Sequence, residues 1–191
     1  MDRPALHDPR VLRAIAHPVR NRILTELDAH GPLRAADVAQ LLGVPANSAS
    51  FHLRQLAKFG LVEEDPAAAR DKRDRVWALT EQADQDISLG EIEKMPGGKA
   101  ASAVFRRTTA AWGRHVVDEA FTDDRTPGRQ ISVMEQPLRL TKHEAEVLSH
   151  RLVDVVKDYK DELPADAEDR RTYLVYQIVL PHPERDSGAQ R

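Results

Sequence analysis

Residues 38–64, VAQLLGVPANSASFHLRQLAKFGLVEE, decide the fold predicted for this chain. Two apolar patterns with helical spacing flank the turn at residues 43–45 (GVP), where glycine ends one helix and proline precedes the next. We predict one helix over about residues 35–42 and a second over about residues 46–59. Their inward residues are Val38, Leu41 and Leu42 in the first helix and Ala49, Leu53 and Leu56 in the second. Two helices joined by such a turn form a helix-turn-helix unit.

Two further helices are predicted before this unit. Asp8-Pro9 is an N-cap followed by proline at the first helical position. The helix that it starts breaks at His17-Pro18, and the next one ends at Gly31-Pro32. Apolar side chains with helical spacing are Val11, Leu12, Ile15 and Ala16 in the first of these helices and Val19, Ile23, Leu24 and Leu27 in the second. Both helices can therefore pack against the helix-turn-helix unit.

A β-hairpin is predicted after the unit. Residues 61–64 (LVEE) and 75–79 (RVWAL) have the composition of short antiparallel strands. The polar segment between them, residues 65–74, is too charged to lie in a core and is expected to form an exposed tip. This hairpin completes a predicted fold that is mainly α with a small β part, a winged helix-turn-helix domain.

The stretches LRAIAHPVRNRILTEL at 12–27 and VAQLLGVPANSASFHLRQLAKFGLVEE at 38–64 resemble the winged helix-turn-helix of the arsenic-repressor (ArsR) family. The resemblance covers residues 8–80. It implies a homodimeric, sequence-specific DNA-binding transcription regulator, which we expect to be a repressor. Phe51 departs from the family, whose members usually carry a polar residue there. The resemblance does not extend to the second half of the chain.

The helix at 46–59 is the predicted recognition helix, because several polar residues lie off its apolar stripe. Asn, Gln and Arg can make bidentate contacts with base edges, while Ser and Lys suit phosphates or single contacts. Phe51 could touch a thymine methyl or simply cover the turn, and a histidine at position 52 is more often packed than reading a base. The candidate DNA-binding residues are Asn47, Ser48, Ser50, Phe51, His52, Arg54, Gln55 and Lys58 on the helix and Arg70, Lys72, Arg73 and Arg75 on the hairpin.

The hairpin residues are open to two interpretations. Their positive charges favour contact with phosphates or the minor groove. Asp71 and Asp74 lie among them, however, and a charged loop tip in solvent would have the same composition. Taken alone, the polar face of the helix could also be an ordinary solvent-exposed surface. For the domain as a whole, the alternative function is that of a winged helix that binds only proteins.

The charge of the chain is divided unevenly. The net charge is −3, but residues 1–80 hold 12 basic and 10 acidic residues, whereas the other residues hold 16 and 21. No carboxylate occurs between Asp37 and Glu63, the stretch that contains the predicted recognition helix. The negatively charged phosphates of DNA attract basic side chains and repel acidic ones. A stretch without carboxylates is therefore suited to contact with duplex DNA.

The second half is predicted to combine helices and strands. We expect a long amphipathic helix over residues 100–121 and another that begins at the capping box Thr141–Glu144 and reaches about residue 163. Residues 131–134 and 171–180 (RTYLVYQIVL) have strand composition. The predicted organisation is a DNA-binding domain at 1–80, a linker at 81–99, a dimerisation and effector-binding region at 100–180 and a disordered tail at 181–191.

Several other functions are disfavoured. The chain has no cysteine, which excludes thiolate metal sites and a cysteine nucleophile. No phosphate loop, zinc-protease motif or nucleophile elbow occurs, so we expect neither an enzyme nor a cofactor. His143, Glu146 and His150 share one helix face, and a metal-responsive repressor that uses these ligands is a minor alternative. No apolar run approaches the ~20 residues of a membrane helix, and we expect a cytoplasmic protein without a membrane partner. A small organic effector or a protein partner is expected to act through the second half.

Overall fold

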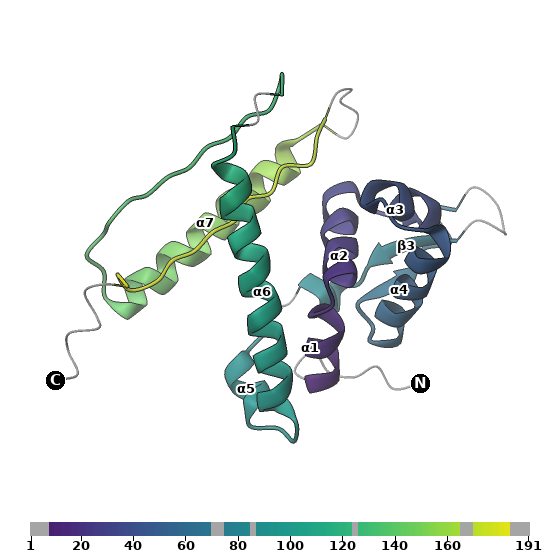
Figure 1. Cartoon of the computed structure of the whole chain (residues 1–191), viewed down its shortest axis with the longest axis horizontal. Helices are drawn as coiled ribbons and strands as arrows, with labels where there is room; N and C mark the ends of the chain where they lie inside the picture. The colour runs from purple at the N-terminus through teal and green to yellow at the C-terminus, as the bar shows by residue number, and fades with distance from the viewer. Residues whose placement is uncertain (1–7, 70–74, 85–86, 124–125, 165–169, 184–191) are drawn as a thin grey trace. The chain divides into compact units, whose positions relative to one another are not determined.

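The computed structural model describes residues 8–69, 75–84, 87–123, 126–164 and 170–183 (Figure 1). The chain divides into two compact units, residues 1–115 and residues 116–191.

The first unit is a winged helix-turn-helix domain, which confirms the predicted fold class. Four helices and three short strands make up its main body, followed by a 3-10 turn and two more helices. In chain order these elements are α1 (Pro9–Ile15), α2 (Pro18–His30), β1 (Leu33–Arg34), α3 (Ala35–Leu42), α4 (Ala46–Lys58), β2 (Val62–Glu64), β3 (Val76–Leu79), η1 (Glu81–Asp84), α5 (Leu89–Glu93) and α6 (Gly98–Ala120), whose last residues, 116–120, belong to the second unit.

Local sequence signals set most helix ends. The Asp8 carboxylate accepts a hydrogen bond of 2.7 Å from the Arg10 main-chain N–H, and Pro9 lies at the start of α1. Gly43 ends α3 in the left-handed conformation at φ 66°, which an L side chain rarely adopts. The helix-turn-helix therefore begins and ends its turn where glycine and proline predict it.

The three strands form an antiparallel sheet in the order β1-β3-β2. Val62 pairs with Leu79 in the wing hairpin, and Leu33 pairs with Trp77 at the other edge. β1 was not predicted, because two residues after Gly31-Pro32 are too short to show a period of two. It becomes a strand only because β3 offers it a free edge.

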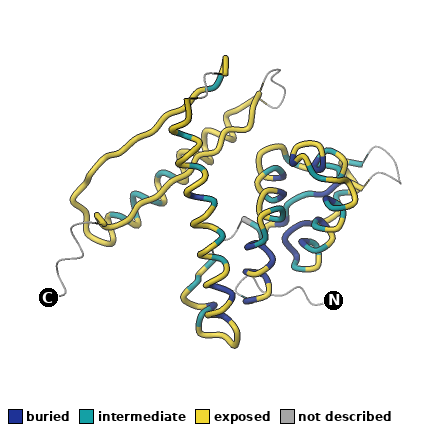
Figure 2. The backbone as a smooth tube through the Cα atoms, in the orientation of Figure 1, coloured by how far each residue is buried: buried dark blue, intermediate teal, exposed yellow. Residues whose placement is uncertain are grey.

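The core of this unit lies between the helices and the sheet (Figure 2). Leu41, predicted to point inward, is instead 43% exposed. Val38 and Leu42 are buried as predicted, and Ala39 takes the third buried position of α3 in place of Leu41. The largest fully buried aliphatic side chains are Leu12, Ile23, Leu27, Leu53, Leu56, Leu61 and Ile92.

The segment expected to be a linker, residues 81–99, contains part of this core. Ile92 of α5 is fully buried, and so is Ala101 near the start of α6. Gly98 lies so close to α5 that a Cβ there would collide with the main-chain carbonyl oxygen of Ile92. The helix pair α5 and α6 therefore continues the packing of the winged helix beyond residue 80.

The second unit contains α7 (Lys142–Glu162) and two extended segments, residues 129–140 and 170–183. The predicted capping box is present, since the Thr141 hydroxyl accepts from the Glu144 N–H at 3.2 Å and the Glu144 carboxylate accepts from the Thr141 N–H at 2.7 Å. The strands predicted at 131–134 and 171–180 are not formed. Extended backbone becomes a strand only when a neighbour supplies hydrogen bonds, and the described residues 131–134 and 173–180 make no main-chain hydrogen bond to another main-chain group.

Candidate nucleic-acid interface

The recognition helix α4 has one buried and one exposed face. Ala49, Leu53 and Leu56 are all fully buried, as predicted, and fix the helix on the core. The side of α4 that faces away from this stripe is formed by residues at helical spacing. These residues, here called the outward face, are Asn47, Ser50, Phe51, Arg54 and Lys58.

The outward face is polar except for one ring. Asn47, Arg54 and Lys58 are exposed and Ser50 is half-buried, while Phe51 is 50% exposed. Amide, hydroxyl and guanidinium groups on one side of a helix can reach base edges in a major groove. The exposed aromatic ring between them can add apolar contact with a thymine methyl.

The other predicted helix residues lie to the side. Ser48, His52 and Gln55 are half-buried, and His52 contacts the residue that precedes α2. The ring centroids of His17 and His52 are 4.7 Å apart, and Phe51 lies edge-on to His52 at 5.2 Å. This contact joins the recognition helix to the start of α2, so His52 is placed for packing rather than on the outward face.

The histidine contact is electrostatically unfavourable for positive charge. Burial lowers the pKa of both His17 and His52, and the nearby Arg20 guanidinium lowers both further. Within the described residues, the Nδ1 atoms of the two histidines and the Nε atom of Arg20 are buried without a hydrogen-bond partner. The neutral forms of both imidazoles are therefore favoured in the folded domain.

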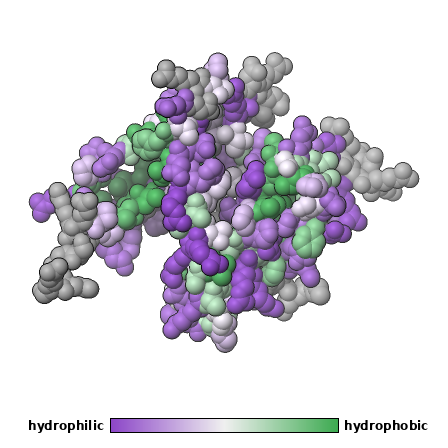
Figure 3. Space-filling model, viewed as in Figure 1, coloured by the Kyte–Doolittle hydropathy of each residue, from purple (hydrophilic) through white to green (hydrophobic). Residues whose placement is uncertain are grey.

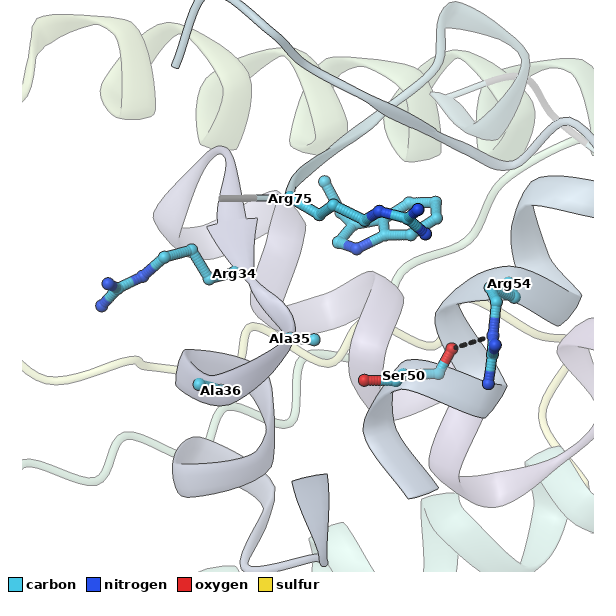
Figure 4. Close-up of a pocket in the computed structure, with 7 residues that line it drawn as sticks. Arg34, Ala35, Ala36, Ser50, Arg54 and Arg75 are labelled. Atoms are coloured by element: carbon cyan, nitrogen blue, oxygen red, sulfur yellow. Dashed lines mark hydrogen bonds between the residues drawn. The ribbon is translucent and has the colours of Figure 1, made fainter. Parts of the chain in front are cut away.

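A groove of about 460 Å³ lies beside the outward face (Figure 4). The recognition helix, the start of α3 and the wing strand β3 with the residue before it line this groove. We call it the basic groove, since three guanidinium groups and no carboxylate line it. Its lining residues are Arg34, Ala35, Ala36, Ser50, Arg54, Arg75 and Trp77.

The three arginines of the basic groove differ in their partners. Arg34 forms an ion pair of 2.7 Å with Asp37, and Arg75 forms a longer one of 3.6 Å with Glu64 across the wing. Arg54 donates from Nε to the main-chain carbonyl oxygen of Ser50 at 3.1 Å, four residues back. In the part of the chain that the structure describes, Arg54 has no carboxylate partner, so its terminal nitrogens are available to an external anion or base.

Of the four predicted basic residues of the wing, Arg75 is the one that lies among the described residues. Arg75 is exposed and directly precedes β3. The predicted tip residues Arg70, Lys72 and Arg73 lie outside the described residues. The wing therefore adds one arginine that can be placed, at the rim of the basic groove.

Two residues of the groove were not predicted from the sequence. Arg34 is the N-cap of α3, where its main-chain N–H donates to the Asp37 carboxylate at 3.1 Å. Trp77 is a core residue on β3 that also borders the groove. The acidic residue at the third position of α3 was the available signal for Arg34, but the approach of Trp77 to the recognition helix is a tertiary contact without a local signal.

The three residues considered as possible metal ligands lie in the second unit. His143, Glu146 and His150 are all exposed on α7, and Glu146 forms an ion pair of 3.6 Å with Lys142. Across the residues that the structure describes, no group of three or more His, Cys, Asp or Glu side chains gathers as a metal site would require. None of the described helices combines the length and apolarity needed to cross a bilayer.

Comparison with known proteins defines the class. Residues 15–65 match the family described as "Helix-turn-helix domain". The ArsR-type resemblance is thereby confirmed for this part of the chain, and the protein is a winged helix-turn-helix DNA-binding transcription regulator. No significant match is found among curated proteins.

Several solved structures show some similarity to this chain. They include YusO from Bacillus subtilis (15% identity, 78% of this chain and 79% of that chain, TM-score 0.37) and wild-type MarR from E. coli in the apo form (16%, 78% and 88%, TM-score 0.36). A mutant of ZitR from Lactococcus lactis in the apo form matches at 19% identity over 75% of this chain and 83% of that chain, with a TM-score of 0.33. Because these identities and TM-scores are low, the class of the protein is assigned from the match of residues 15–65 and from the secondary-structure elements of the first unit.

Proposed function

We propose that this protein is a homodimeric repressor that binds a two-fold DNA site sequence-specifically. In this proposal, α4 of each subunit enters the major groove and its outward face contacts base edges. The wing approaches the flanking phosphates or minor groove, and the two recognition helices lie about one helical turn of DNA apart. A cytoplasmic location follows from the proposed ligand.

The observation that supports this proposal most directly is that the Arg54 guanidinium lies in the basic groove without a carboxylate partner among the described residues. The guanidinium lies next to Ser50 and the start of α3. Exposed Asn47 and Lys58 extend the same face. Guanidinium is the side-chain group best matched to guanine O6 and N7 or to phosphate. A winged helix that binds only proteins would not need a carboxylate-free recognition helix.

We assign the second unit to dimerisation rather than to an effector pocket. Among the described residues from 116 to 183, none is buried. Tyr159 is 64% exposed and Tyr173 is 58% exposed, which is the exposure of surface rings and not of a pocket lining. An effector, if one acts here, would then change the dimer rather than fill a cavity.

The test is a binding titration of Arg54→Ala. A duplex is first selected by the wild-type protein from a random-sequence pool. The variant is expected to lose about 1–3 kcal/mol on this duplex and to show weaker sequence preference. Arg114→Ala, an exposed arginine on α6, serves as the matched control and should bind as the wild type does. Unchanged affinity of Arg54→Ala would contradict the assigned face, and no binding of any duplex by wild type at low salt would favour the protein-interaction alternative.

A further inference from the structure

The second unit exposes far more apolar surface than the first. Of the 23 large apolar side chains that are exposed in the described residues, 19 lie between Val117 and Leu180. Figure 3 shows this apolar surface gathered over α7 and the extended segments of the unit. Isolated exposed apolar residues are normal, but contiguous patches mark an interaction site.

The segment at residues 171–180 has the composition of a strand that is buried on both faces. Tyr173, Val175 and Val179 point to one side of an extended chain, while Leu174, Tyr176 and Ile178 point to the other. All six are exposed in the single chain. Continuous apolar runs of this kind are typical of strands that are covered on both faces.

The main chain of residues 173–180 is also unpaired. No main-chain hydrogen bond to another main-chain group is made by the described residues 173–180, and the same is true of residues 131–140. Gln177 donates from its side chain to the Ser149 carbonyl oxygen of α7 at 3.5 Å, which holds the segment along the helix. An extended apolar segment with free N–H and C=O groups is a template for pairing with another strand.

Within one chain, residues 131–140 can pair with only one edge of the segment 171–180. Pro137 in the segment 131–140 has no N–H to donate, which confines that segment to an outer position in a sheet. The segment 171–180 has no proline and can accept a neighbour on each edge. Residues 131–140 can supply one neighbour at most, so the second edge stays open to a strand from another molecule.

We propose that residues 171–180 pair with the same residues of a second copy of this chain, antiparallel about a two-fold axis near Tyr176. The resulting sheet would have four strands, with the two copies of 171–180 in the centre and the proline-containing segments outside. The proposal rests on the proposed function for the need of a dimer and specifies its interface.

The charges of the segment favour a second copy in this orientation. Residues 172–180 hold no charged side chain, so two copies can lie side by side without an ion that needs a partner. Tyr176 is the middle residue of this run. An antiparallel arrangement also separates Arg170 and Arg171 from their copies, whereas a parallel one would place like charges together.

Cysteine cross-linking tests the interface, since the natural chain has no cysteine and an introduced thiol can pair only with its own copy. A disulfide requires Cα atoms within about 7 Å. We expect Tyr176→Cys to form a covalent dimer of the full chain on mild oxidation. The matched control is Tyr173→Cys, which is on the same segment and more exposed. Its two copies would lie about 20 Å apart in the antiparallel pair, and we expect little cross-linking.

Sedimentation of the unmodified chain gives a second measurement. Wild type is expected to sediment as a dimer at micromolar concentration. Ile178→Arg, which places a charge inside the proposed sheet, should sediment as a monomer, while Asp154→Arg on an exposed position of α7 should remain dimeric. Circular dichroism of both variants shows whether the helices are retained.

Three results would overturn the interface: a monomeric wild type, a dimeric Ile178→Arg, or cross-linking of Tyr173→Cys that equals that of Tyr176→Cys. The proposed function fails by a different measurement. A protein that cross-links as expected but binds no duplex keeps this interface and loses the proposed function. A dimeric Ile178→Arg that still binds DNA keeps the proposed function and loses this interface.

Discussion

At the scale of single residues, the contact between His17 and His52 has the clearest consequence. Burial lowers the pKa of both imidazoles, and the charge of Arg20 acts in the same direction. Below a pH of about 6.5, the ordinary histidine pKa, the unfolded chain therefore binds more protons than the folded domain. The free energy of unfolding is unaffected by this pair above that pH and decreases as the pH falls below it.

The corresponding prediction is a fall in the thermal unfolding midpoint between pH 7 and pH 5. His52→Gln removes one titrating ring and should make this fall shallower. His150→Gln, at an exposed position on α7, should leave it unchanged. Midpoints measured by circular dichroism across this pH range check the prediction. An identical pH dependence in wild type and His52→Gln would show that the pair does not limit acid stability.

At the scale of the elements, the contact of α5 with α6 makes the start of α6 sensitive to a single methyl group. A Cβ at Gly98 would collide with the Ile92 carbonyl oxygen, and the Ile92 side chain is fully buried, so α5 cannot move away without disturbing the core. Gly90, on the same short helix α5, has open space around its own Cβ position. The two glycines thus form a matched pair.

We expect Gly98→Ala to lower the free energy of unfolding by about 1–3 kcal/mol, the usual range for overpacking. Gly90→Ala should be neutral or stabilising by up to about 1 kcal/mol, because alanine favours helix more than glycine does. Urea unfolding of the full chain measures both. Equal stability of the two variants would mean that α5 and α6 do not pack as closely as described.

At the scale of the whole molecule, charge is separated between the DNA-binding part and the rest. The acidic excess lies outside residues 1–80, so local basic residues must supply the attraction to phosphate. We expect the double substitution Lys72→Ala and Arg73→Ala to weaken binding to all duplexes alike. The slope of log K against log salt should become shallower by roughly 0.9 for each lost phosphate contact.

The control for this prediction is the pair Lys142→Ala and Arg151→Ala, which removes two exposed basic residues from α7 and keeps the net charge the same as in the wing variant. Its salt slope should equal that of wild type. If both double variants shift the slope alike, the effect belongs to the net charge of the protein and not to contacts of the wing.

The sequence by itself determined the winged helix-turn-helix. The inward stripe of α4, the turn ended by Gly43 and the capping box at Thr141 follow from helical periodicity and from local hydrogen bonding, which act over a few residues. For the same reason the outward face of α4 could be predicted with Asn47, Arg54 and Lys58 on it. Local signals are strong where a single element meets the core along one face.

Tertiary structure alone decided the rest. No local pattern encodes contacts between residues that are far apart in the chain. Examples are the contact of His52 with His17, the position of Trp77 at the basic groove and the burial of Ile92 in the core. In the segment 171–180, local sequence predicts a strand that the single chain does not form. Its side chains predict a strand, but a strand exists only when a neighbour pairs with it, and a local pattern does not say which segment that neighbour is.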